Sequence, residues 1–173
     1  EIAADVIAEC PDDDWRLIFA LARYGGMRCP SEVLTLKWSD VLWDQEKLRI
    51  DSPKTGVRFC PIFPELAPIL EAAFDAAPEG ATFCVQQYRH GYNPATTMKK
   101  IIERAGHEPW PKLFINCRST RRTELQRQYP DHVINKWLGH SSAVAEKHYL
   151  QVTTDDWAEG ATRKTVNEVG QTV

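Results

Sequence analysis

The chain has 173 residues, 43% of them hydrophobic, which is enough for one domain with a complete core. No apolar run approaches the roughly 20 residues that span a bilayer, and the N-terminus lacks a signal-peptide pattern, so we expect a cytoplasmic protein without a membrane partner. A net charge of −3 excludes a globally basic surface, yet residues 99–136 carry nine Lys and Arg against four Asp and Glu.

The first third of the chain predicts two helices and a hairpin. Asp12–Asp14 resemble an N-cap with an acidic first turn before WRLIFALARYG, whose apolar positions recur at helical spacing until a Gly-Gly pair ends the helix. Ser31 and Glu32 begin a second helical run, EVLTLKW. KLRID and RFCPIF are typical of two short strands, and the intervening SPKTGV predicts a hairpin loop with Lys54 near its tip.

The rest of the chain is expected to be mainly helical. Pro64 begins the amphipathic helix PELAPILEAAFDAAP, and GATFCV predicts a short buried strand. From Pro94 the predicted helices are ATTMKKIIERAG, NCRSTRRTELQRQ, DHVINKWLG and SAVAEKHYLQV, and a polar tail begins at Thr153. The expected fold class is therefore α+β: mostly α, with a small antiparallel β-hairpin or sheet.

The segment WLGHSSAVAEKHYLQV contains the pattern that most suggests chemistry. It predicts His140 and Tyr149 on consecutive short helices, and Gly139 permits the tight turn between them. Taken alone, LGH is typical of a helix C-cap followed by a polar residue, and a tyrosine in an apolar helix usually belongs to the core. The motifs upstream decide between these interpretations.

Four motifs in this order, YGGMRCPSEVLTLKWSDV, SPKTG, NCRSTRRTEL and WLGHSSAVAEKHYL, resemble the catalytic domain of the tyrosine recombinases, or phage integrase family. The resemblance covers most of residues 15–152. It implies a site-specific DNA recombinase or integrase that cleaves and rejoins DNA through a 3′-phosphotyrosyl intermediate, with no metal or nucleotide cofactor. It also implies double-stranded DNA as the partner, a tetramer on DNA, a monomer when isolated and, in a bacterium, association with the nucleoid.

The resemblance assigns five catalytic residues. Arg28 and Arg118 match two arginines that meet the charge on the phosphate oxygens, a task suited to a planar, permanently charged guanidinium. Lys54 matches a general acid that protonates the leaving 5′ oxygen, and His140 matches a donor to a phosphate oxygen. Tyr149 matches the nucleophile.

One position departs from the family pattern in a way that affects the chemistry. The family commonly has a histidine three residues before the second arginine, where this chain has Ile115. Isoleucine cannot accept the tyrosine proton, so water, a neighbouring basic group, His148 or the electrostatic surroundings alone must assist. A register with Arg121 or Arg122 as the second arginine restores no histidine and upsets the spacing to LGH, so we retain Arg118.

Other charged residues are expected to support the catalytic arginine or to contact the DNA backbone. Glu32 follows Arg28 by four residues rather than the commoner three, and it either braces that arginine from behind or is a plain helix N-terminal carboxylate. Contacts with the DNA backbone are expected from basic residues in the helices of the second half, namely Lys99, Lys100, Arg121 and Arg122.

Metal binding is not expected from the spacing of candidate ligands. The five cysteines are irregularly spaced and include no CxxC pair, which favours reduced core thiols. His90, His107 and His132 show no ligand spacing with each other or with the cysteines.

The domain organisation follows from the resemblance. We expect residues 1–152 to form the catalytic domain and residues 153–173 to form a C-terminal tail, which either docks on a neighbouring subunit or frays. The N-terminal DNA-binding domain of the family is expected to be absent from the chain. Two alternatives stay open: a non-catalytic DNA-binding relative, suggested by Ile115, and a type IB topoisomerase-like strand transferase.

Overall fold

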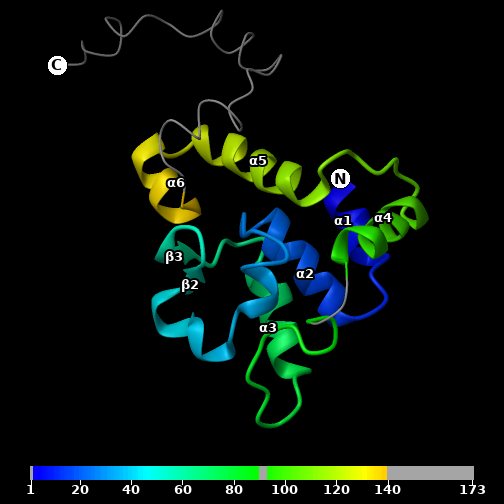
Figure 1. The fold of residues 1–173 in the computed structure, drawn as a ribbon, viewed down its shortest axis with the longest axis horizontal. Coiled ribbons are helices and arrows are strands. Elements are labelled where there is room, and N and C mark those ends of the chain that lie inside the picture. The colour runs from blue at the N-terminus through cyan, green and yellow to red at the C-terminus, as the bar shows by residue number, and fades with distance from the viewer. Residues whose placement is uncertain (1, 90–92, 140–173) are drawn as a thin grey trace, which may run out of the picture.

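The computed structural model describes residues 2–89 and 93–139. These residues form six α-helices and a three-stranded antiparallel sheet, which confirms the expected fold class (Figure 1). In chain order the elements are α1 (Ile2–Ala8), α2 (Asp13–Arg23), β1 (Val41–Leu42), β2 (Lys47–Ser52), β3 (Gly56–Pro61), α3 (Ala67–Asp75), α4 (Pro94–Arg104), α5 (Leu113–Gln126) and α6 (Asp131–Leu138).

Helix α2 is the centre of the core. The side chain of Asp12 accepts a hydrogen bond from the Trp15 backbone N–H at 2.8 Å, which confirms the predicted N-cap. From Leu17 to Ala22 every residue of α2 is buried, because α1, α3 and α5 pack around this helix. In Figure 1, α5 and α6 lie on one side of α2 and the sheet, and α3 lies on the opposite side.

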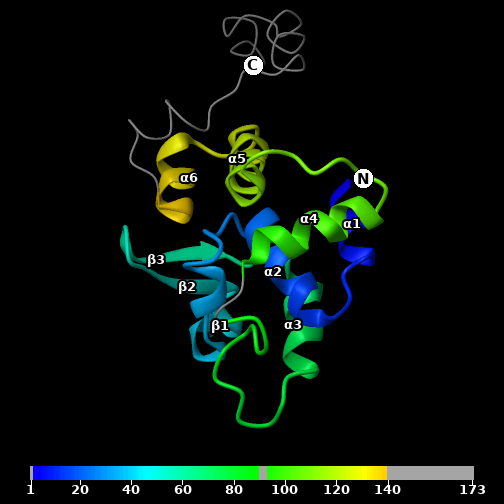
Figure 2. The ribbon, with the colours of Figure 1, turned by 45° about the vertical axis from the view of Figure 1, so that its right-hand side comes forward.

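The sheet has the order β1-β2-β3, and its predicted hairpin is confirmed. Ile50 pairs with Arg58, and Leu48 pairs with Cys60, so these four side chains share the buried face of the hairpin. Val57 and Phe59, which alternate with them on β3, are about half exposed. Helix α6 packs against β3, as the turned view in Figure 2 shows, so the hairpin and the end of α6 are neighbours.

The run EVLTLKW is not the helix that its pattern predicts. It forms a short 3-10 turn at Val33–Thr35, after which Leu36 is extended. The carbonyl of Leu36 accepts from the Cys84 N–H at 2.9 Å, and the Trp38 N–H donates to the Thr82 carbonyl at 3.0 Å. Backbone pairing with a distant segment therefore replaces the next helical turn.

Two further predictions in this region need correction, and the later ones are largely confirmed. GATFCV forms only an isolated bridge between Lys37 and Phe83 rather than a strand, and α3 begins at Ala67, three residues after Pro64. Helices α4, α5 and α6 form where they are predicted. The helix SAVAEKHYLQV and the polar tail lie outside the described residues. In the described part of the chain, no helix is long and apolar enough to cross a membrane.

Candidate active site

The turn at the end of α6 is the point on which the candidate residues converge. Gly139 has a φ of 70°, the left-handed conformation expected of a helix C-cap, and its N–H donates to the Asn135 carbonyl at 2.8 Å. A Cβ atom at this position would lie 3.0 Å from Cδ of Arg58 and 3.1 Å from Oγ1 of Thr55. The turn that precedes His140 is thus pressed against the hairpin that carries Lys54.

This close approach makes Gly139→Ala more destabilising than an ordinary glycine substitution. Any L-residue in the left-handed region costs about 1–2 kcal/mol, and at Gly139 the methyl group also displaces Arg58. Gly106 is a matched control, because it follows α4 with a φ of 81° and a Cβ atom there would have no neighbour within 4 Å. We expect urea denaturation to show that Gly139→Ala loses about 1 kcal/mol more than Gly106→Ala. Equal losses would contradict the close packing of the turn.

Arg28 is held at this turn by main-chain and carboxylate partners. Its Nη2 donates to the Gly139 carbonyl at 2.9 Å, and its Nη1 donates to Oε1 of Glu32 at 2.6 Å. The Arg28 backbone N–H also donates to Oε2 of Glu32 at 2.8 Å. The Arg28 side chain remains 20% exposed, so it is accessible from solvent. This geometry favours the bracing role over the plain carboxylate interpretation of Glu32.

Glu32 is the buried anion of the site. Besides Arg28 it binds Arg58, whose Nη1 and Nη2 donate to the two carboxylate oxygens at 2.8 and 2.7 Å. Burial alone would raise the pKa of Glu32, but the hydrogen bonds and charge of Arg58, together with the hydrogen bonds from Arg28, lower that pKa to about 2. Glu32 is therefore a carboxylate at neutral pH.

Arg118 approaches the same turn from α5. Its side chain is 2% exposed and donates to the carbonyls of Gly26 and Leu138. Arg28 and Arg118 thus bind the consecutive carbonyls of Gly139 and Leu138. The structure brings the two arginines together, although they are 90 residues apart in the sequence.

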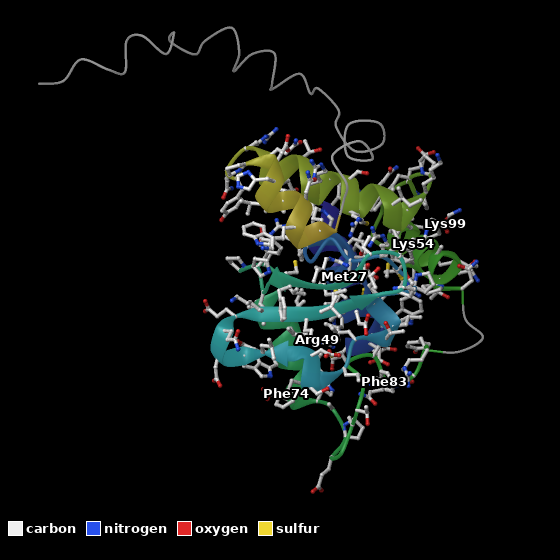
Figure 3. The ribbon with its side chains drawn as sticks, turned by 60° about the vertical axis from the view of Figure 1, so that its left-hand side comes forward. Met27, Arg49, Lys54, Phe74, Phe83 and Lys99 are labelled. Atoms are coloured by element: carbon white, nitrogen blue, oxygen red, sulfur yellow. The ribbon has the colours of Figure 1, made fainter. Side chains whose placement is uncertain are left out.

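Lys54 and Ile115 lie at the surface. Lys54 occupies the turn of the hairpin and is exposed, as Figure 3 shows. Ile115 is 52% exposed, one helical turn before the buried Arg118. His140 and Tyr149 lie outside the described residues, so their place in this arrangement stays a prediction.

The four predicted DNA-backbone residues divide into two groups. Arg121 binds Glu65 through both Nη atoms at 2.9 and 3.0 Å, and Arg122 binds Asn135 at 2.7 Å. Both guanidinium groups are buried and bind side chains within the fold, and their expected contact with DNA phosphates stays a prediction. Lys99 and Lys100 are exposed on α4, so the expectation holds for them as a prediction.

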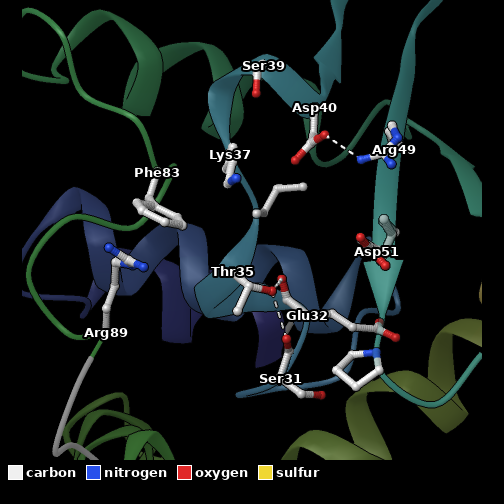
Figure 4. A pocket seen from close by; sticks show the side chains of 13 residues that line it. Ser31, Glu32, Thr35, Lys37, Ser39, Asp40, Arg49, Asp51, Phe83 and Arg89 are labelled. Carbon is white, nitrogen blue, oxygen red and sulfur yellow. Dashed lines mark hydrogen bonds and ion pairs between the residues drawn. The ribbon is translucent and has the colours of Figure 1, made fainter. Parts of the chain in front are cut away.

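A polar cavity of about 720 Å³ borders the site (Figure 4). Glu32 and Pro53 lie at its wall, which makes it continuous with the Arg28 region and the hairpin. Across the cavity, Arg89 stacks on the ring of Phe83 with its Cζ 3.1 Å from the ring centroid. A large open space therefore lies next to Glu32, the carboxylate that binds Arg28, and next to the hairpin loop at Pro53.

Arg58 is the residue of this site that the sequence motifs do not reveal. The run RFCPIF indicates an apolar strand, and the signal for Arg58 lies in the strand alternation. If Leu48 and Ile50 face the core, their hairpin partners Cys60 and Arg58 must face it too. A buried arginine needs an acidic partner, and Glu32 is the acid that supplies it.

Comparisons with known proteins agree with this architecture. The model of the phage integrase family matches residues 4–155, whereas no curated protein sequence matches the chain. The crystal structure of XerA recombinase superposes with a TM-score of 0.73 and 20% identity, over 99% of this chain and 64% of that one.

Two DNA complexes are also similar in fold. XerH recombinase in a post-cleavage complex with a palindromic difH substrate has a TM-score of 0.69 and 17% identity, over 96% of this chain and 50% of XerH. The Tn1549 transposon integrase with transposon right end DNA has a TM-score of 0.63 and 18% identity, over 91% of this chain and 62% of that protein. The chain therefore spans less than two thirds of each of these three proteins.

Proposed function

Because the chain belongs to the phage integrase family, we propose that it carries the strand-transfer chemistry of a site-specific DNA recombinase or integrase. The Tyr149 hydroxyl attacks a DNA phosphodiester to form a 3′-phosphotyrosyl bond, and its proton passes to water or to a neighbouring base such as His148. The bond from phosphorus to the 5′ oxygen breaks, and Lys54 supplies the proton to that oxygen. Attack by a 5′-hydroxyl reverses these steps and rejoins the DNA.

The observation that supports this proposal best is the convergence of cationic groups on the turn before His140. Arg28 and Arg118 bind the carbonyls of Gly139 and Leu138, and the hairpin that carries Lys54 packs against Gly139. A phosphodiester under attack develops negative charge, which fixed cations and donors stabilise strongly in a partly buried site.

The contacts that the two arginines make with the α6 turn are compatible with phosphate binding. Arg28 and Arg118 donate to neutral main-chain carbonyls at this turn. A phosphate oxygen carries charge and is a stronger acceptor than a carbonyl, and a guanidinium can fork onto two such oxygens. We therefore propose that bound DNA displaces these carbonyls from the arginines.

The proposed partner is double-stranded DNA. The XerH and Tn1549 complexes, similar to this chain in fold, contain DNA. The exposed Lys99 and Lys100 are the proposed backbone contacts in α4. We propose assembly into a tetramer on DNA, with residues 153–173 as the segment that docks on a neighbouring subunit.

A library of nicked duplexes tests the proposed function without requiring a defined target sequence. Each duplex carries randomised sequence around a nick placed so that the short fragment with the newly formed 5′-hydroxyl is lost, which prevents religation. Incubation in EDTA, followed by denaturing electrophoresis, should reveal a covalent protein–DNA adduct, because the proposed cations are side chains rather than metal ions. The adducted DNA can then be recovered and sequenced to define the preferred site.

Tyr149→Phe is the matched control for this experiment, because it removes only the phenolic oxygen. The variant should form no adduct while binding the recovered DNA with unchanged affinity. If the protein binds DNA from the library but forms no adduct, the chain is a non-catalytic relative and the proposal fails. An adduct that persists in Tyr149→Phe would show that another group is the nucleophile.

A further inference from the structure

Arg58 joins three segments that carry the proposed catalytic residues. It lies on β3, four residues after Lys54, and its Nε donates to the Trp137 carbonyl near the end of α6 at 2.9 Å. Its two Nη atoms fork onto Glu32, which in turn binds Arg28. The hairpin, the Arg28 segment and the turn at Gly139 thus meet at one guanidinium.

Arg58 acts on the site through its neighbours. Its side chain is 6% exposed, and its Nε and both Nη atoms already bind Trp137 and Glu32, so the guanidinium is committed to partners within the protein. A Cβ atom at Gly139 would lie 3.0 Å from Cδ of Arg58. The aliphatic part of the Arg58 side chain therefore packs directly against the turn. Any effect of Arg58 on DNA chemistry must therefore pass through Glu32, Arg28 or the α6 turn.

The charge balance of this cluster depends on Arg58. Glu32 accepts four hydrogen bonds, two from Arg28 and two from Arg58. With both arginines present the cluster keeps a net positive charge. Without Arg58, Glu32 would pair with Arg28 alone, and the net charge of the cluster would fall to zero.

We propose that Arg58 is a positioning residue for strand cleavage: it is the counter-cation of Glu32, and it thereby keeps the cluster net positive and Arg28 in place at the Gly139 turn for a DNA phosphate. This inference rests on the proposed function. Lysine cannot replace Arg58, because an ammonium group lacks the fork that binds both Glu32 oxygens and the Nε that binds Trp137.

The test compares Arg58→Lys and Arg58→Met with the wild-type chain on the DNA recovered from the nicked library. Single-turnover cleavage, DNA affinity and urea denaturation are measured for each protein. Arg58→Lys is expected to cleave about 10- to 100-fold more slowly, the usual loss for a residue that orients a group in direct contact. Its DNA affinity should change much less, because Arg58 does not contact DNA.

Arg23→Lys is the control for simple loss of a forked, partly buried ion pair. Arg23 forks onto Glu124 at 3.0 and 2.5 Å, and its side chain is 11% exposed, but Glu124 also binds Arg121 rather than Arg28 or Arg58. This variant should lose stability as Arg58→Lys does, while its cleavage rate stays at the wild-type value.

The double variant Arg58→Met with Glu32→Gln isolates the charge effect. The cleavage rate of the double variant should be severalfold higher than that of Arg58→Met alone, because Glu32→Gln leaves no negative charge that competes for Arg28. A purely structural role predicts that the second substitution slows cleavage further, and that result would overturn the inference. Wild-type-like cleavage by Arg58→Lys would also overturn it. Absence of cleavage by the wild-type chain would instead refute the proposed function.

Discussion

Arg118→Lys is expected to slow single-turnover DNA cleavage by at least about 10²-fold, the loss typical of removing one preorganised donor from a developing oxyanion. Arg118 is 2% exposed, and its two Nη atoms bind the Gly26 and Leu138 carbonyls simultaneously. An ammonium group cannot reproduce that planar fork, either on these carbonyls or on two phosphate oxygens.

The same substitution should lower the free energy of unfolding. One buried carbonyl, at Gly26 or Leu138, would lose its donor, and an unsatisfied buried acceptor costs about 1–3 kcal/mol. Urea denaturation measures this loss, and cleavage is then compared at a temperature where both proteins are folded. Arg23→Lys again controls for destabilisation. Cleavage by Arg118→Lys within a few-fold of the wild-type rate would show that Arg118 does not contact the reacting phosphate.

Glu32→Gln is expected to be among the most destabilising single substitutions in the chain. It removes the only anion that Arg28 and Arg58 share in the described residues, and breaking a buried pair typically costs about 3–5 kcal/mol. Equilibrium urea denaturation at pH 7 measures the difference from the wild-type chain.

The pH dependence of this difference identifies its electrostatic origin. The pKa of Glu32 is lowered from 4.5 to about 2 in the folded chain, so its contribution is fully present above about pH 5. As the pH falls from about 4.5 towards 2, the unfolded chain takes up the proton first, and the contribution is lost. The shift corresponds to about 3 kcal/mol. The stability gap between wild type and Glu32→Gln should therefore shrink between about pH 5 and pH 3. A gap that stays constant would contradict the charged pairing.

Local patterns predicted most of the secondary structure, and they failed where distant backbone pairing decided the conformation. The capped α2, the hairpin and α4 to α6 follow from caps, periodicity and turn residues. EVLTLKW has the local pattern of a helix, but its backbone hydrogen bonds go to residues 82–84. That pairing depends on where the chain returns after α3, which no window of local sequence contains.

The residues of the candidate site were likewise predicted only in part from the sequence. The motif order predicted Arg28 and Arg118, and the structure brings both to one turn. The motifs did not predict Arg58, because its importance comes from hairpin register and from the burial of Glu32. Arg121 shows what a basic residue type alone does not reveal: its guanidinium stacks on Phe63 and binds Glu65, and its expected contact with DNA stays a prediction.

The central claim is that this chain joins itself to DNA through Tyr149 in a site built around Arg28 and Arg118. The most direct measurement is mass spectrometry of the covalent adduct after nuclease trimming and proteolysis. We predict a peptide in which Tyr149 carries a nucleotide through its 3′ phosphate, and no such peptide from Arg118→Lys under the same short incubation. A nucleotide attached to a different residue, or through its 5′ phosphate, would contradict the account.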